Sequence, residues 1–499
     1  MAMPTTTLAQ LLATTDFIWS RPAPTAPHLT NIQWRADACD ARSILFFQRF
    51  DDNLTDAELY QRYFAGRSFA ALVTNRRLDC FEQLPPTIAL AVTGPERWAE
   101  VVRQFCDLVY PLDTARLRFI GVTGTNGKTT TVKYLEALLT AHGQRVLSIG
   151  TLGVFLDGER LVETGFTSPP LIELRRLLHA HQDHADVVLM ETSSHALDQG
   201  RVAGIPFQAG GWTNFTQDHL DYHRDEAHYF AAKARLLALI QPGGQLYCTS
   251  PAVVERLAAD VAAGALPVAV TLLEPAQLAP EALTAQPFLA LAHNRANYAL
   301  ALALAECVLG TAPAADAWRQ LQPVAGRFEC QVYGQRAIVI DFAHTPDALD
   351  TILSAIRSGF PEARIAALFG CGGDRDRSKR PLMGAAVARH SDAIFVTSDN
   401  PRHEAPERII EDIVRGIPAD QDYRVIVDRA QAIAALFDQL DTRPAEECWV
   451  ALIAGKGHER YIDQNGHKTP YSDQEQVAHA LQRLGWTLQN TGNTGNTGV

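Results

Sequence analysis

The stretch Gly121-Val-Thr-Gly-Thr-Asn-Gly-Lys-Thr129 decides the fold class of this chain. The apolar run Leu117–Val122 leads into it and predicts a buried strand, and Thr129–His142 follows it with the apolar spacing of a helix. A glycine-rich turn between a strand and a helix N-terminus points backbone N–H groups at an anion, and the helix dipole adds to the attraction. The sequence therefore predicts a phosphate-binding loop in a domain with a parallel sheet.

The side chains of this loop suit a nucleoside triphosphate. Lys128 is expected to neutralise the β- and γ-phosphates, and the Thr129 hydroxyl to ligate Mg²⁺. The usual eight-residue pattern needs a glycine where Val122 stands, whereas Gly124 lies three positions before Gly127. A plain connecting turn is disfavoured because the lysine, the hydroxyl and the strand–helix context coincide. The residues expected to contact the nucleotide here are Gly124, Thr125, Asn126, Gly127, Lys128, Thr129 and Thr130.

Apolar runs elsewhere in the chain predict further buried strands, and helical stretches alternate with them. This alternation is typical of α/β proteins with doubly wound parallel sheets. A chain of 499 residues exceeds the size of one ordinary core, so several domains are expected. Boundaries are predicted near Pro111–Arg116 and Leu321–Ala325. The predicted strands are Ser43–Gln48, Ala70–Thr74, Thr87–Val92, Val187–Glu191, Ala337–Asp341, Ile365–Phe369, Ala393–Thr397 and Trp449–Ala454.

Composition narrows the class of protein. The net charge of -12 argues against general nucleic-acid binding, which needs a basic face. The 8 cysteines include no CxxC metal pair, which fits buried thiols in a reducing cytoplasm. Neither a signal peptide nor an apolar run of about 18 residues is evident, so we expect a cytoplasmic protein without a membrane span. The oligomeric state is not indicated.

Further blocks, taken with Thr123–Thr129, resemble motifs of the Mur ligase family, and most closely those of its MurE branch. Together they run from about Arg118 to Asp473. The blocks are Met190-Glu-Thr-Ser-Ser-His-Ala-Leu-Asp-Gln-Gly-Arg-Val202, Thr213-Asn-Phe-Thr-Gln-Asp-His-Leu-Asp-Tyr-His223, Tyr229-Phe-Ala-Ala-Lys233, Gly326-Arg-Phe-Glu329, Asp341-Phe-Ala-His-Thr-Pro-Asp347, Phe369-Gly-Cys-Gly-Gly-Asp-Arg-Asp376, Asp399-Asn-Pro-Arg402 and Ala454-Gly-Lys-Gly-His-Glu459.

This resemblance implies an ATP- and Mg²⁺-dependent ligase of peptidoglycan synthesis. Such an enzyme activates a carboxylate as an acyl phosphate and couples it to an amine. The implied substrates are UDP-N-acetylmuramoyl-L-Ala-D-Glu and meso-diaminopimelate. The resemblance also implies three domains: a small N-terminal α/β acceptor domain (1–112), a central ATP-binding domain resembling P-loop ATPases (113–322) and a Rossmann-like amino-acid domain (323–487). The Asn-Thr-Gly repeats of residues 488–499 predict a disordered tail.

By the same resemblance, Thr129, Glu191 and His219 are expected to ligate magnesium. Lys233 lies in the helical stretch Glu226–Leu237, where a lysine is ordinarily a solvated surface charge. The resemblance suggests instead a carbamylated lysine, whose carboxylate-like group could bind a second Mg²⁺. Lys128, Glu191, His219 and Lys233 are the expected catalytic residues.

The resemblance extends to contacts with the nucleotide and with the D-glutamyl end of the acceptor. Hydroxyls and a guanidinium suit a carboxylate, although hydroxyls before Pro169 could equally cap a helix or a turn. The expected nucleotide contacts are Asn294, Arg327, Asp341 and His344, and the expected acceptor contacts are Thr167, Ser168, Ser193, Gln199 and Arg201.

The block Asp399–Arg402 resembles the form found in relatives that use meso-diaminopimelate. Arg402 could grip the distal carboxylate in a bidentate manner, and a lysine substrate would lack that partner. Glu459 could pair with the distal ammonium. Taken alone, an Asn-Pro turn with a solvated arginine would be the simpler interpretation. The full set of expected contacts is Arg375, Asp399, Asn400, Pro401, Arg402, Gly455 and Glu459.

The N-terminal region departs from the family pattern. Residues Trp34–Arg42 stand where an Asp-Ser-Arg-like block is usual, Asp51–Thr55 replaces a glycine-rich stretch, and Thr167–Pro170 differs from Thr-Thr-Pro plus a polar residue. No UDP-binding residue can therefore be carried over. Two other hypotheses stay open: a ligase of the same type with a different, non-UDP carboxylate acceptor, and a non-catalytic nucleotide-binding scaffold.

Overall fold

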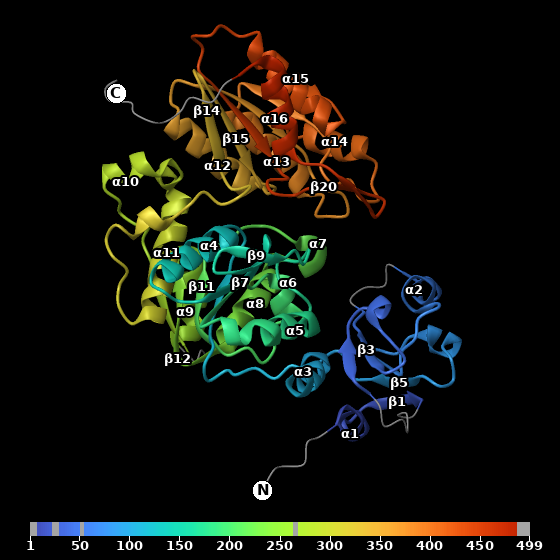
Figure 1. Ribbon diagram of the computed structural model, residues 1–499. Coiled ribbons are helices and arrows are strands. Elements are labelled where there is room, and N and C mark those ends of the chain that lie inside the picture. The colour runs from blue at the N-terminus through green and yellow to red at the C-terminus, as the bar shows by residue number, and fades with distance from the viewer. Residues whose placement is uncertain (1–6, 22–28, 50–53, 263–267, 487–499) are drawn as a thin grey trace.

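The computed structural model describes residues 7–21, 29–49, 54–262 and 268–486. Three mixed sheets of five, eight and six strands carry helices on their faces (Figure 1). This confirms the expected α/β class with three domains. The predicted tail and Asp51–Asn53 lie outside the described residues. Among the helices described, none combines the length and apolar character that crossing a bilayer requires.

The N-terminal sheet has the order β1-β5-β4-β3-β2, with β1 antiparallel and the others parallel. Side chains alternate across it, so Ile44 and Phe46 face one apolar cluster and Leu45 faces another. Its elements are α1 (Leu8–Thr14), β1 (Ile18–Arg21), β2 (Asn31–Gln33), β3 (Ser43–Phe47), α2 (Asp56–Leu59), β4 (Ala71–Thr74), β5 (Ala89–Val92) and α3 (Trp98–Val109).

The central sheet has the order β13-β12-β11-β6-β10-β7-β8-β9. Strands β8 and β9 are antiparallel additions at one edge, and the other strands are parallel. The strands are β6 (Arg118–Thr123), β7 (Val146–Gly150), β8 (Gly153–Leu156), β9 (Glu159–Val162), β10 (Val187–Glu191), β11 (Phe207–Trp212), β12 (Ile240–Cys248) and β13 (Ala269–Leu272). The helices are α4 (Lys128–Ala141), α5 (Leu171–His181), α6 (Ser194–Asp198), α7 (Leu220–His223), α8 (Glu226–Ala234), α9 (Pro251–Ala262), α10 (Pro280–Ala285) and α11 (Ala292–Leu309).

The register of β6 against its two neighbours positions the site. Val122 lies opposite Glu191 of β10, and Thr123 lies opposite Trp212 of β11. All three strands are parallel, so their carboxyl ends meet at one edge of the sheet. Ligands of open α/β sheets bind at such an edge.

The N-terminal domain is fixed to the central domain by α3 and α5. Leu171 and Ile172 of α5 belong to the apolar cluster of the N-terminal sheet. The Arg175 side chain is almost fully buried, and its Nη2 donates to Asp107 Oδ1 at 2.6 Å and to the Tyr110 carbonyl at 3.1 Å. Figure 1 shows α3 lying between the blue N-terminal sheet and α5.

The C-terminal sheet has the order β14-β15-β19-β16-β17-β18, antiparallel only at β14. Asp341 lies opposite Ala454, so residues after β15 and β19 share one edge. The strands are β14 (Glu329–Tyr333), β15 (Arg336–Asp341), β16 (Arg364–Phe369), β17 (Ala393–Val396), β18 (Tyr423–Val425), β19 (Trp449–Ala454) and the hairpin β20 (Tyr461–Gln464) with β21 (His467–Pro470). The helices are α12 (Pro346–Gly359), α13 (Lys379–His390), α14 (Pro406–Val414), α15 (Arg429–Asp441) and α16 (Asp473–Leu484).

Candidate functional site

The loop between β6 and α4 is held open by two glycines in left-handed conformations. Gly124 has φ +140, and a Cβ there would lie 1.9 Å from Thr213 Oγ1. Gly127 has φ +84, and a Cβ there would lie 2.5 Å from Asn297 Oδ1. The loop is tied to the end of β11, because Asn126 N donates to Asn214 Oδ1 at 2.9 Å. This backbone has the strand–loop–helix form that the sequence predicts for a phosphate site.

Two lysines meet at this loop. Lys128 Nζ donates to the carbonyl oxygens of Gly124 and Thr125, both at 2.9 Å. Lys233, on α8, donates to the same Gly124 carbonyl at 2.8 Å and lies 4.5 Å from the centre of the Tyr229 ring. The Lys233 side chain is buried, and burial together with the nearby Lys128 charge holds its pKa well below the usual range. Burial also lowers the pKa of Lys128, and the Glu191 carboxylate opposes that shift.

Glu191, at the end of β10, connects the loop to its surroundings. Its carboxylate accepts hydrogen bonds from the Thr129 hydroxyl at 3.0 Å, from the Thr151 hydroxyl at 3.0 Å and from the Thr151 backbone N–H at 2.9 Å. Gly150 leaves room for it, because a Cβ there would lie 2.0 Å from Glu191 Oε1. A buried carboxylate beside a hydroxyl offers the hard oxygen ligands that Mg²⁺ prefers.

His219 has a left-handed backbone, with φ 55, just before α7. Its ring lies 4.8 Å from that of His195 and 6.0 Å from that of Tyr229. Burial holds the pKa of His219 well below its ordinary value, which favours a neutral imidazole able to ligate a metal. In the described part of the chain, no three His, Cys, Asp or Glu side chains form a group that could hold a metal ion by themselves.

A cavity of about 230 Å³ opens beside the loop, between the central and C-terminal domains. It is lined by several of the predicted nucleotide contacts: Asn126, Gly127, Thr130, Asn294, Arg327 and Asp341. Asn294 Nδ2 donates to the Phe288 carbonyl at 2.9 Å. His344 is not among the lining residues; its Nε2 lies 4.0 Å from Asp218 Oδ2.

Arg327 brings the C-terminal domain onto the loop. Arg327 Nη2 lies 3.4 Å from Thr129 Oγ1, and the guanidinium lies 4.5 Å from the centre of the Phe342 ring. Burial lowers the pKa of Arg327, and Asp341 and Glu191 oppose that shift. Asp341 accepts from the backbone N–H groups of Phe328 and Ala343, both at 2.7 Å. A positive side chain therefore reaches the phosphate loop from the far side of the cavity.

Sequence reasoning missed several residues that line this cavity. Asn297 lies one helical turn after Asn294 on α11 and contacts Gly127, so the spacing of two asparagines was an available signal. Asp347 also lines it, at the start of α12, and burial raises the pKa of this carboxyl. Other polar lining residues that were missed include Asn214, Thr249 and His293.

A larger cavity, of about 1260 Å³, lies between the N-terminal and central domains, and Asp374 and His403 of the C-terminal domain also line it. Phe166, Gln199 and Arg201 line it from the central domain. From the N-terminal domain it is lined by basic and aromatic side chains that sequence reasoning could not assign: Trp34, Arg35, Phe46, Phe47, Arg49, Arg62, Tyr63, Arg67 and Trp98.

The predicted acceptor contacts form one hydrogen-bonded chain that leads to Glu191. Arg201 donates to Gln199 Oε1 and to the Ser168 carbonyl, both at 2.8 Å. Ser168 Oγ donates to the Glu191 carbonyl at 2.6 Å and lies 3.3 Å from Ser193 Oγ. Thr167 Oγ1 lies 3.0 Å from Thr151 Oγ1, which also contacts Glu191. Ser193 also caps α6, which is the structural role expected of a hydroxyl at that position.

The predicted amino-acid contacts lie at the edge of the C-terminal sheet. Arg402 has φ 50, its Nη1 donates to the Gly373 carbonyl at 2.7 Å, and its backbone N–H donates to the Asp463 carbonyl at 2.9 Å. Arg375 lies near enough that the Arg402 charge, after burial, lowers its pKa. Two neighbouring guanidiniums of this kind suit a carboxylate ligand.

The other predicted contacts surround a fully buried lysine, Lys456. Its Nζ lies 3.6 Å from Asp399 Oδ1, 3.0 Å from Asn400 Oδ1 and 3.1 Å from Glu459 Oε2. Gly455 is required here, because a Cβ would lie 2.6 Å from Asp399 Oδ2. Burial and Asp399 raise the pKa of Glu459. The Pro401 carbonyl lies close to Gly373, because a Cβ added to Gly373 would be 1.9 Å from that oxygen.

The chain is similar to known proteins. Residues 122–263 match the family profile described as Mur ligase middle domain, and residues 326–457 match that of the Mur ligase, glutamate ligase domain. A protein of Nostoc sp. (strain PCC 7120) named UDP-N-acetylmuramoyl-L-alanyl-D-glutamate--2,6-diaminopimelate ligase is 35% identical, over 95% of this chain and 98% of its own.

Solved structures are also similar. One, of a UDP-N-acetylmuramoyl-L-alanyl-D-glutamate--2,6-diaminopimelate ligase, has a TM-score of 0.53 and 25% identity, and the match covers 92% of this chain and 96% of that one. Another, of a bifunctional folylpolyglutamate synthase/dihydrofolate synthase from Yersinia pestis complexed with AMPPNP and Mn ion, has a TM-score of 0.52. At 19% identity, over 79% of this chain and 93% of that one, it supports the fold alone.

Proposed function

The chain belongs to the Mur ligase family, and on that premise we propose that it couples meso-diaminopimelate to UDP-N-acetylmuramoyl-L-alanyl-D-glutamate at the expense of ATP. The reaction would add the third residue of a peptidoglycan stem peptide in the cytoplasm. One observation carries the proposal: the phosphate loop, Glu191, Lys233 and Arg327 meet at one edge of the central sheet, beside the 230 Å³ cavity.

Each domain takes one substrate in this proposal. Residues 1–112 bind the nucleotide end of the acceptor, residues 113–322 bind ATP, and residues 323–487 bind the incoming amino acid. The 1260 Å³ cavity supports the first assignment, because its arginines and aromatic rings suit a pyrophosphate and a uracil. Asn294, Arg327 and Asp341 line the cavity beside the loop, which supports their role as nucleotide contacts.

The reaction would proceed in two steps. An acceptor carboxylate oxygen attacks the γ-phosphorus of ATP, which gives an acyl phosphate and ADP. The amine then attacks the acyl carbon and loses one N–H proton to solvent, and collapse of the tetrahedral intermediate breaks the C–O bond and releases phosphate. Both steps gather negative charge, so fixed positive groups should supply most of the acceleration. Lys128, which contacts the loop carbonyl of Gly124, and Arg327, which reaches the Thr129 hydroxyl, are the groups proposed to offset that charge.

Thr129 and Glu191 have the oxygen chemistry that Mg²⁺ requires, and His219 supplies a neutral imidazole. Bound Mg²⁺ would offset the charge of the phosphate oxygens. Gly124 and Gly127 leave the loop free of side-chain atoms that would block phosphate.

Lys233 is proposed to carry a carbamate, formed when its Nζ attacks CO₂. Only an uncharged amine can make that attack, and burial favours the uncharged form of Lys233. The helix α8 holds Nζ against the loop, so the carbamate oxygens would lie beside the phosphates.

Arg402 and Arg375 are proposed to bind the distal carboxylate of meso-diaminopimelate. Glu459 and Asp399 would meet its distal ammonium group. The two neighbouring guanidiniums, and the two carboxylates that surround Lys456 at the same edge of the sheet, support an amino acid with charges of both signs at its far end.

The test is phosphate release with mass detection of the product, using UDP-N-acetylmuramoyl-L-Ala-D-Glu and either meso-diaminopimelate or L-lysine. We expect a tripeptide product with diaminopimelate and little with L-lysine. Lys128→Ala should abolish coupling and leave the fold intact by circular dichroism, because it removes the phosphate-binding charge. Folded protein that binds ATP and makes no product with either amine would contradict the acceptor assignment.

A further inference from the structure

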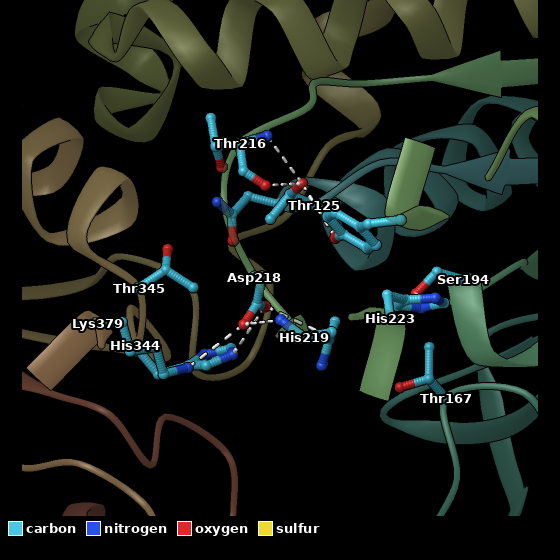
Figure 2. A network of polar contacts seen from close by, with 12 residues as sticks. Thr125, Thr167, Ser194, Thr216, Asp218, His219, His223, His344, Thr345 and Lys379 are labelled. Carbon is cyan, nitrogen blue, oxygen red and sulfur yellow. Dashed lines mark hydrogen bonds and ion pairs between the residues drawn. The ribbon is translucent and has the colours of Figure 1, made fainter. Parts of the chain in front are cut away.

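The central and C-terminal domains are also joined by an ion pair, Asp218 with Lys379, to which the proposed reaction gives no role. Gln217, Asp218 and His219, between β11 and α7, face residues 376–379 at the start of α13. Figure 2 shows Asp218 and His219 next to Lys379 and His344, which come from the other domain.

The centre of this contact is a buried ion pair. Lys379 Nζ lies 3.3 Å from Asp218 Oδ1, and both side chains are more than nine-tenths buried. Gln217 Nε2 adds contacts to Asp376 Oδ2 at 3.3 Å and to Ser378 Oγ at 3.2 Å. Buried charges of this kind are costly to leave unpaired, so each depends on the other domain being in place.

On one side, this contact orients His219. Asp218 Oδ1 accepts from the His219 backbone N–H at 2.9 Å, and its Oδ2 lies 3.4 Å from His219 Nε2. The strained backbone of His219, with φ 55, needs such support from its surroundings. Asp218 therefore fixes both the main chain and the ring of a proposed metal ligand.

On the other side, the contact continues into the amino-acid pocket. Asp376 accepts from Ser378 N at 2.9 Å and from Ser378 Oγ at 2.6 Å, which fixes the turn into α13. Arg375 directly precedes Asp376, and the Gly373 carbonyl accepts from Arg402. The segment 373–379 therefore contacts Arg402 at one end and carries Lys379 at the other.

We propose that Asp218 and Lys379 are positioning residues, a clasp across the domain boundary that sets His219 at the phosphate site when the loop carrying Arg375 is in place. The clasp links occupancy of the amino-acid pocket to the geometry of the phosphate site. This inference rests on the proposed function, because it assumes that the two pockets serve one reaction.

The experiment compares Lys379→Gln and Lys379→Arg in the full chain, with Arg389→Gln as the matched control. Arg389 is an exposed cation of the same helix, paired with Asp350 on the surface. The measurements are the ATP affinity by calorimetry, KM for diaminopimelate, kcat, and melting temperature. We expect Lys379→Gln to lower kcat at least tenfold and raise KM for diaminopimelate several-fold. Its ATP affinity should stay within about twofold, because the nucleotide cavity is untouched. Lys379→Arg should recover most of the activity, and Arg389→Gln should match the wild type.

A double variant separates positioning from simple loss of stability. Asp218→Asn with Lys379→Gln removes both buried charges, so its melting temperature should recover, while kcat stays low because His219 has lost its carboxylate. If kcat per folded molecule is normal in Lys379→Gln, or returns with stability in the double variant, the clasp has no positioning role. The wild type is assayed in the same series. Its failure to couple would contradict the proposed function, whereas an active wild type beside an unaffected variant would contradict the clasp alone.

Discussion

At the scale of single residues, Lys233 and Lys128 both lie at the phosphate loop, but only Lys233 is proposed to be carbamylated. Both donate to the Gly124 carbonyl, but Lys233 is the one on a helix outside the phosphate loop. If Lys233 is carbamylated, Lys233→Arg should lower kcat by roughly 10²–10³-fold, because an arginine cannot supply the negative oxygens. Enzyme incubated with isotope-labelled bicarbonate should show a carbamate carbon by NMR.

The matched control for that variant is Lys133→Arg. Lys133 is also a largely buried lysine with a lowered pKa, caused first by burial, but its Nζ pairs with Glu136 at 2.6 Å, one turn further along α4, and does not contact the Gly124 carbonyl. Its replacement should leave coupling near the wild-type level. Full activity of Lys233→Arg would refute the carbamate.

Arg402 is expected to select the amino-acid substrate. Arg402→Lys should raise KM for meso-diaminopimelate about 10- to 100-fold, because a lysine cannot make the bidentate contact with the distal carboxylate. The low activity with L-lysine as substrate should fall less than the activity with meso-diaminopimelate. Steady-state kinetics with both amines would show this, with the exposed Arg408→Lys as control. Equal losses with both amines would contradict the role of selector.

At the scale of secondary-structure elements, the two ends of α4 offer a matched pair. Gly127 precedes the helix with φ +84 and lies against Asn297, whereas Gly143 follows it with φ +74 and has nothing within 4 Å. Gly143→Ala should cost about 1–2 kcal/mol of unfolding free energy from backbone strain alone, without effect on ATP binding.

Gly127→Ala should cost a similar amount of stability and also lose ATP affinity on the order of 10-fold or more. The added methyl group would displace Asn297 and distort the loop. Calorimetric titration with ATP and urea unfolding of both variants would test the pair. If both variants bind ATP with wild-type affinity, ATP binding does not depend on the loop conformation that Gly127 allows.

Elements buried on both faces were predictable from the sequence, and exposed ones were not. The predictions Val187–Glu191 and Trp449–Ala454 match β10 and β19 to the residue, because apolar runs mark such strands. The predicted strand Leu117–Val122 lies within one residue of β6. Strand β9 has no buried residue, so it left no apolar pattern to find. The same holds for β21.

The residues of the site also divide into those that a local sequence motif identifies and those that only the docking of domains brings together. Motifs identified the residues of the loop and Glu191, whose roles remain predictions. The contact between Asp218 and Lys379 joins positions 161 residues apart, and neither residue is unusual in its own segment. Pairings of that kind depend on how two domains dock, which no local pattern records. The cavity of the N-terminal domain was missed because its arginines come from separate turns and strands.

At the scale of the whole molecule, half-buried histidines predict acid sensitivity. Burial lowers the pKa of His195 and of His293 to about 4, and burial with the Arg327 charge lowers that of His458 to about 3. The unfolded chain, with histidine pKa values near 6.5, binds more protons between about pH 4 and 6.5. The free energy of unfolding should therefore fall as pH falls through that window, by up to about 1.4 kcal/mol per pH unit for each histidine.

Urea unfolding at pH 7 and pH 5 would measure this slope. His458→Gln should make it shallower by removing one such group, whereas His479→Gln, at an exposed position of α16, should not change it. A slope unchanged by His458→Gln would mean that this ring is protonated equally in both states.

The contact between α3 and α5 determines where this protein could be cut to exchange its N-terminal domain with that of a relative. A gene fusion cut near residue 112 would separate Asp107 from Arg175 and would remove Leu171 and Ile172 from the core they help to fill. A foreign acceptor domain would then meet an α5 shaped for a different partner. Because α5 begins directly after Ser168-Pro-Pro170, that mismatch would reach the residues beside Glu191. The unit that can be exchanged as a whole is therefore discontinuous in the gene: the N-terminal domain together with the buried face of α5.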